Sequence, residues 1–154
     1  MSEYLRLARL YMLLLAIYTL GRSLQGVAGT PYERGHQVFS IVTLTILSSV
    51  LYGAFCRRWQ GFRLWQALLM GLLFGLMSQV VIFAATVLSY ALGIQTYFNY
   101  PRALNVPAPI GLGEAVLRRL AGLVANSITV SIAGALGWAM GALLPERGPT
   151  PPQP

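Results

Sequence analysis

Three polar side chains lie at the ends of, or inside, uncharged apolar stretches of the sequence. Arg22 follows the uncharged run 10–21, Gln79 lies in the middle of a long run, and Asn126 lies soon after the start of another. An unpaired amide in hydrocarbon costs several kcal/mol, and a guanidinium at the bilayer centre costs at least about 2.5 kcal/mol. We therefore expect each of the three to find a polar partner, and they are the candidate ligand-, lipid- or partner-binding residues.

Arg22 has two interpretations. At the end of a helix, its guanidinium would snorkel to the lipid headgroups. If it is buried, it must bind an anionic lipid headgroup, a carboxylate of a partner, or Glu33 at the start of the next expected helix.

The two amides also have two interpretations. Amide side chains inside a membrane commonly form hydrogen bonds between helices, each of roughly 0.6 kcal/mol on average. Alternatively, Gln79 and Asn126 line a small polar cavity together with Ser78, Thr86 and Ser127.

No complete catalytic or metal-binding motif occurs in the sequence. Glu33 and His36 have the spacing of half a di-iron carboxylate motif, but there is no second copy, and Glu33 also suits helix capping. We expect no metal and no cofactor. Weak acid–base chemistry by Glu33, His36 and Glu114, which are expected on one side of the membrane, is the least favoured function.

The composition is that of a membrane protein. Of the 154 residues, 56% are hydrophobic and 10% are charged, whereas soluble domains carry about 25% charged residues. All 11 basic residues are Arg, set between apolar runs rather than gathered in one basic region, which argues against nucleic-acid binding. Arg without Lys, beside abundant Ala, Gly and Pro, suggests a GC-rich bacterial coding sequence.

The lengths of the uncharged runs predict an all-α, four-helix transmembrane bundle. A hydrocarbon core of about 30 Å needs roughly 20 helical residues. We expect one transmembrane domain over residues 1–144, with spans at 5–27, 34–56, 66–92 and 119–144. The first apolar run is short, which leaves three interpretations. It spans a locally thinned bilayer with Arg9 and Arg22 snorkelling at its two ends, it extends as a helix from about Leu5 to Val27, or it is a secretory signal peptide.

Local signals set the expected helix ends and the loops. Thr30, Pro31 and Glu33 form a capping-box pattern that places the start of the second helix near Pro31, and Gly93 should end the third. Aromatic residues suited to the membrane–water boundary lie in the interfacial loop 93–118 (Tyr97, Phe98, Tyr100) and just before it (Tyr90). The loop ends in a short interfacial helix before the fourth span. Residues 145–154 contain five prolines and should be a disordered tail.

Small residues mark the expected helix-packing face, because they let helices approach closely in lipid. The third helix has Gly71 and Gly75, and the fourth has a stripe at four-residue spacing: Ala125, Thr129, Ala133, Gly137 and Gly141. This stripe packs inside the bundle or, alternatively, against another subunit.

With four spans, both termini lie on one side of the membrane. The positive-inside rule then indicates whether that side is the cytoplasm. The turn after the second helix holds the densest basic cluster, Arg57, Arg58 and Arg63. We therefore expect the bacterial inner (plasma) membrane, with both termini in the cytoplasm.

These features favour a non-catalytic structural or accessory subunit, or a self-associating bundle. The alternative is a small carrier or channel for a lipid or small solute through a polar bundle interior. The expected partners are the bilayer, a homo-oligomer or larger membrane complex, and an anionic lipid, with no nucleic acid.

Overall fold

The computed structural model describes residues 3–145, which form helices joined by loops with no strand. Four long helices are apolar enough to cross a membrane, so the expected all-helical set of four is confirmed. The helices in chain order are α1 (Glu3–Leu7), α2 (Arg9–Val27), α3 (Tyr32–Gly35), α4 (Ile41–Gln60), α5 (Leu64–Ala91), the 3-10 turn η1 (Pro101–Leu104), α6 (Leu112–Met140) and the 3-10 turn η2 (Gly141–Leu143). The expected disordered tail lies outside the described residues except for Pro145.

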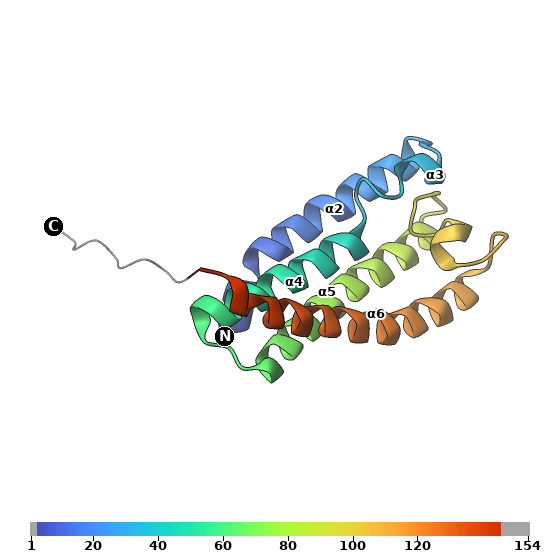
Figure 1. Ribbon diagram of the computed structural model, residues 1–154. Helices are drawn as coiled ribbons and strands as arrows, with labels where there is room; N and C mark the ends of the chain where they lie inside the picture. The colour runs from blue at the N-terminus through green and yellow to red at the C-terminus, as the bar shows by residue number, and fades with distance from the viewer. Residues whose placement is uncertain (1–2, 146–154) are drawn as a thin grey trace.

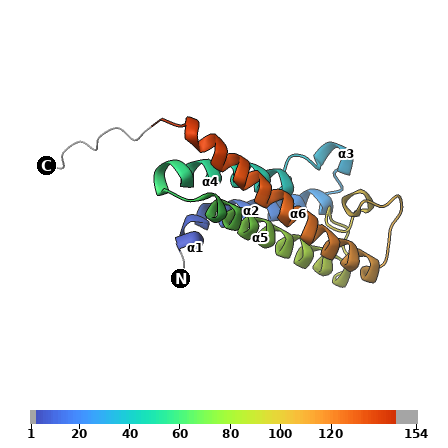
Figure 2. The same cartoon turned by 60° about the horizontal axis from the view of Figure 1, so that its bottom comes forward.

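The long helices run alternately up and down, as Figures 1 and 2 show. The start of α1, the turn between α4 and α5, and the end of η2 lie at one end of the bundle, which we call the terminal end. The helix α3 and the long loop between α5 and α6 lie at the other, which we call the loop end. Both ends of the described chain are therefore on the same side, as four spans require.

Two expected helix boundaries are wrong. The chain does not start a long helix near Pro31, because α3 is a single short helix with no side-chain cap, and α4 begins only at Ile41. The Ser40 hydroxyl accepts a hydrogen bond from the Thr43 amide at 3.3 Å and caps α4. The expected interfacial helix before the fourth span is the first part of α6 itself, since nothing interrupts the helix from Leu112 onward.

The end of α5 is the one expected from sequence. Gly93 has φ +62, in the left-handed region where glycine has no steric penalty. Its amide donates to Tyr90 O at 3.2 Å, and the Ile94 amide donates to Ser89 O at 3.1 Å. These two bonds form a Schellman motif, which satisfies carbonyls that the helix leaves unpaired and turns the chain into the loop.

The helix α6 packs with its backbone against both α4 and α5. A Cβ atom on Gly53 would overlap Gly134 O, and one on Gly71 would lie 2.7 Å from Val130 O, so both positions need glycine. Hydroxyl groups bond across the same contacts: Ser49 donates to Val130 O, and Ser131 donates to Leu68 O, both at 2.8 Å. Lipid provides no hydrophobic driving force between helices, so close backbone packing of this kind is what holds helices together in a membrane.

The small-residue stripe of α6 divides into two parts. Ala133, Gly137 and Gly141 are buried, and the two glycines lie against the α4 backbone at Val50 and Ala54. Ala125 and Thr129 are exposed. Gly71 and Gly75 of α5 face α6. The buried part of the stripe therefore serves packing within the chain.

We predict that Gly137→Leu destabilises the protein and that Ala125→Leu does not. A side chain at Gly137 would overlap Val50 O and force two helix backbones apart, at a cost of about 3 kcal/mol or more, whereas Ala125 is exposed. Thermal unfolding in detergent checks this, with Ala125→Leu as the matched control. Equal unfolding temperatures for the two variants would contradict the packing described above.

Candidate functional site

Two adjoining cavities lie between the helices toward the loop end. The first, of about 400 Å³, contains both candidate amides and is called the amide cavity; it is lined by Val42, Gln79, Ile82, Ala103, Leu104, Asn105, Arg118, Arg119, Ala121, Gly122 and Asn126. The second, of about 200 Å³, is called the arginine cavity; it is lined by Arg22, Tyr32, His36, Ser40, Ile41, Val42, Ile82, Phe98, Arg102, Ala103, Asn105 and Arg119. Arg119 lines both cavities.

Arg119 ties α6 to α5 and to the long loop. Its Nε donates to the Thr86 hydroxyl at 3.0 Å, and one terminal nitrogen donates to Phe98 O at 2.7 Å. A guanidinium carries five N–H groups, so these two bonds leave others directed at the cavities. Arg119 is thus a half-buried cation held in one orientation.

Arg22 is half-buried and turned toward the loop. Its terminal nitrogen donates to His36 O at 3.0 Å, and its guanidinium carbon lies 5.6 Å from the centre of the Tyr97 ring. The rings of Tyr32 and Phe98 lie at 5.8 Å, so aromatic faces stabilise the charge. The suggested pairing of Arg22 with Glu33 is not present, because Glu33 pairs with Arg102 at 2.9 Å.

Gln79 and Asn126 approach each other across the amide cavity. Gln79 is only 4% exposed, and neither amide forms a hydrogen bond with the residues 3–145 that the structure describes. A Cβ atom on Gly122 would lie 3.7 Å from Asn126 Nδ2 and 4.0 Å from Gln79 Oε1. Both amide groups therefore converge on the space beside Gly122, where a ligand can meet them.

The other polar residues suggested for this cavity do not line it. Thr86 receives the bond from Arg119, and Ser78 donates to Gly75 O in its own helix at 2.9 Å. Ser127 is buried, and its hydroxyl has no hydrogen-bond partner in the described structure.

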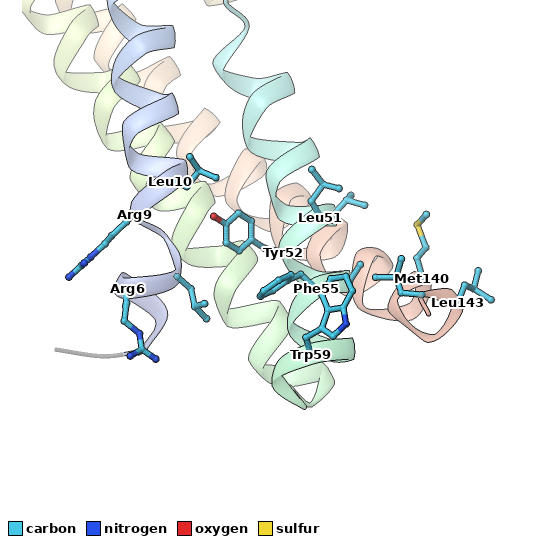
Figure 3. Close-up of a pocket in the computed structure, with 13 residues that line it drawn as sticks. Arg6, Arg9, Leu10, Leu51, Tyr52, Phe55, Trp59, Met140 and Leu143 are labelled. Carbon is cyan, nitrogen blue, oxygen red and sulfur yellow. The ribbon is translucent and has the colours of Figure 1, made fainter. Parts of the chain in front are cut away.

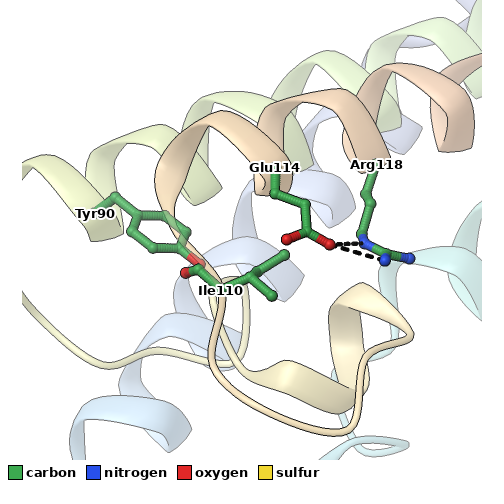
Figure 4. Close-up of polar contacts among 4 residues, drawn as sticks. All are labelled: Tyr90, Ile110, Glu114 and Arg118. Carbon is green, nitrogen blue, oxygen red and sulfur yellow. Dashed lines mark hydrogen bonds and ion pairs between the residues drawn. The ribbon is translucent and has the colours of Figure 1, made fainter.

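No carboxylate lines either cavity among the described residues. Glu114 pairs with Arg118 at 2.9 Å on the surface of α6, beside the Tyr90–Ile110 contact (Figure 4). Glu33 and Glu114 are thus each paired with a different arginine rather than assembled with His36. Within residues 3–145, Arg22 and Arg119 have no acidic counterion, so the cavities carry positive charge.

Arg119 was not among the candidates expected from sequence, although a signal for it exists. Arg118 can form an i,i+4 pair with Glu114, and Arg119 lies about 100° further around the helix. It therefore shares the inward side of α6 with the buried Ala115. An arginine on that side at the start of a span must meet polar partners inside the protein.

The long loop forms the outer wall of the site. The Tyr97 hydroxyl donates to Thr30 O at 2.9 Å and to Pro31 O at 3.1 Å, and burial raises the pKa of this hydroxyl, which keeps it protonated. Tyr97 and Phe98 are each 2% exposed, so they do not lie at the lipid interface as expected. They pack inward against α3 and Arg22 instead.

A third cavity at the terminal end is a large apolar groove of about 860 Å³. Figure 3 shows it beside the start of α2 and the second half of α4, with Leu51, Tyr52, Phe55 and Trp59 among its lining. Arg6 and Arg9 stand at its edge and extend away from it. It offers apolar surface but no convergent polar groups.

Among the described residues, no group of three or more His, Cys, Asp or Glu side chains is placed to hold a metal ion. No protein-family model, curated protein or solved structure matches this chain. Function must therefore be argued from the cavities themselves.

We predict that Tyr97→Phe lowers the free energy of unfolding by about 1 kcal/mol, because a buried hydroxyl that bonds two carbonyls is lost. Tyr100→Phe is the matched control: Tyr100 lies in the same loop, and its ring stacks on Tyr32 with centres 4.9 Å apart. Thermal unfolding of both variants in detergent is the measurement. If the two substitutions lower the free energy of unfolding equally, the Tyr97 hydroxyl does not anchor the loop to Thr30 and Pro31.

Proposed function

We propose that this protein is a non-catalytic, multi-pass protein of a bacterial inner membrane that binds a phosphate-bearing anion in the arginine cavity. The observation that carries the proposal is that Arg22 and Arg119 line one cavity to which the described part of the chain contributes no carboxylate. Two like charges in a half-buried site repel each other, and a bound anion relieves that repulsion.

The chemistry of the site suits a phosphate group. Guanidinium groups present a rigid fork of N–H donors that matches phosphate oxygens. Arg119 and Arg22 each use only part of their donor set on the protein. The Tyr32 and Ser40 side chains also line the cavity and supply hydroxyl groups. A tetrahedral oxyanion can accept several of these bonds at once.

The location of the site favours a lipid as the source of the phosphate. Arg22 lies near the end of α2 and Arg119 near the start of α6, which places both at one boundary of the four-helix bundle. Phospholipid phosphate groups occupy that boundary in a bilayer. A soluble phosphate offers the same chemistry, and the experiment below includes it.

An accessory role in a larger assembly is compatible with lipid binding. The outer side of α2 leaves several large apolar side chains exposed, among them Leu10, Leu13 and Leu24. On α6, Ala125 and Thr129 remain available for contact with another subunit. The buried part of the stripe is not available for such contact, which reduces the surface of α6 that is open to self-association.

We predict that an anionic phospholipid stabilises the protein through Arg119. In neutral detergent, added phosphatidylglycerol should raise the unfolding temperature of the wild type, as a ligand that binds only the folded state does, and phosphatidylcholine should do so much less. Arg119→Met should weaken phosphatidylglycerol binding at least about tenfold, equivalent to about 1.4 kcal/mol.

The matched control is Arg34→Met, which removes the same charge from an exposed position at the same end of the bundle. It should bind like the wild type. Inorganic phosphate and glycerol 3-phosphate are tested in parallel to identify a soluble ligand. Equal stabilisation of wild type and Arg119→Met by phosphatidylglycerol would refute the proposed function.

We also propose that both termini lie in the cytoplasm. Gln60→Cys and Ala108→Cys place exposed thiols at opposite ends of the bundle, while the native Cys56 is buried. A membrane-impermeant maleimide added outside should label Ala108→Cys in intact cells and Gln60→Cys only after permeabilisation. The reverse labelling pattern would show that both termini lie outside the cytoplasm. The unsubstituted chain is the control for labelling of Cys56.

A further inference from the structure

We propose that the amide cavity binds the ester carbonyl groups of a diacyl glycerophospholipid whose phosphate lies in the arginine cavity. This inference rests on the proposed function and deepens it by naming the ligand class. It assigns Gln79 and Asn126 a common role as hydrogen-bond donors to the lipid.

The two cavities are ordered in depth as the parts of such a lipid are. Asn126 lies seven residues along α6 from Arg119, and Gln79 lies seven residues along α5 from Thr86, which bonds to Arg119. At about 1.5 Å per residue, both amides lie about 10 Å closer to the middle of the bundle than the Arg119 contact. In a glycerophospholipid the ester groups likewise lie deeper in the bilayer than the phosphate.

The two amides require a ligand with acceptor groups. Each primary amide has two N–H donors and one carbonyl acceptor, and a polar group without a partner inside a membrane is costly. Gln79 is 4% exposed, lines the amide cavity and bonds to none of the described residues. A ligand that places hydrogen-bond acceptors beside Gly122 accepts from Asn126 Nδ2 directly. It accepts from Gln79 Nε2 after the Gln79 amide, whose Oε1 faces Gly122, turns by about 180°.

The acceptor is neutral rather than a second anion. Apart from its arginines, the wall of the amide cavity consists of amide side chains (Gln79, Asn105, Asn126) and small or apolar residues, including Val42, Ile82 and Gly122. Its arginines, Arg118 and Arg119, stand at the end nearer the loop, and Arg118 is already paired with Glu114. Ester carbonyls are neutral acceptors, and the apolar side chains beside them suit the start of the acyl chains.

The test compares two lipids that differ only in the ester carbonyls. Diacyl phosphatidylglycerol and its dialkyl-ether counterpart have the same charge, headgroup and chain length, but the ether linkage lacks the carbonyl oxygen. Wild-type protein in neutral detergent should bind the diacyl lipid about tenfold more tightly, as expected for two added hydrogen bonds. Because this ratio is measured on the wild type, it does not depend on any variant folding.

Variants then show which residues produce the preference for the diacyl lipid over the ether lipid. Gln79→Leu and Asn126→Leu should each reduce the ratio to about threefold or less and leave binding of the ether lipid within about twofold of wild type, because the arginine cavity is intact. Ser127→Ala is the matched control: it removes a buried hydroxyl next to Asn126 that lies outside the cavity, and its ratio should equal that of the wild type.

The outcomes separate this inference from the proposed function. If Arg119→Met abolishes binding of both lipids but the wild type binds them equally, phosphate recognition stands and the ester-carbonyl assignment is wrong. If neither lipid binds the wild type, both proposals are wrong. They are also wrong if Arg119→Met binds both lipids as tightly as the wild type does. If inorganic phosphate binds the wild type as tightly as the diacyl lipid does, and Arg119→Met loses this binding, the ligand is a soluble anion and the lipid assignment is overturned.

Discussion

The close backbone approach of α6 to α4 and α5 is the constraint on which the rest of the structure depends. Gly137 and Gly141 bring α6 against the α4 backbone at Val50 and Ala54, toward the terminal end. Figure 1 shows α4 and α6 separating toward the loop end, with α5 between them. The amide cavity opens where they separate, with Val42 of α4 and Asn126 of α6 both in its lining. The packing that stabilises one half of the bundle thereby creates the site in the other half.

The charge of Arg119 organises the loop end. A guanidinium near the start of a helix apolar enough to span a membrane needs fixed acceptors, and Arg119 takes them from α5 at Thr86 and from the loop at Phe98 O. The loop is in turn fastened to the residues before α3 by the Tyr97 hydroxyl, and Arg22 packs on the same aromatic rings. Structural anchoring and the proposed ligand recognition therefore share the same side chains. Loss of either arginine is expected to affect the ligand more than the fold, because the helix contacts elsewhere remain.

The sequence predicted the parts of this protein that depend on local chemistry. The four long helices follow from the lengths of the uncharged runs, and Gly93 ends α5 because glycine alone adopts its backbone conformation without cost. Pairings between distant segments were not predictable from spacing. Glu33 pairs with Arg102 rather than Arg22. Tyr97 turns inward although an amphipathic tyrosine ring suits the membrane–water interface. Arg119 was missed because its partners, Thr86 and Phe98, are distant in sequence and come together only when α5, α6 and the loop fold.

The most direct test of the account is the lipid retained by the purified protein, measured by native mass spectrometry after extraction and washing in a mild neutral detergent. The account predicts that the wild type and Arg34→Met each retain a single anionic phospholipid per chain. The double variant Arg22→Met/Arg119→Met should retain none. A double variant that keeps the same lipid as the wild type would contradict the claim that the two arginines hold it.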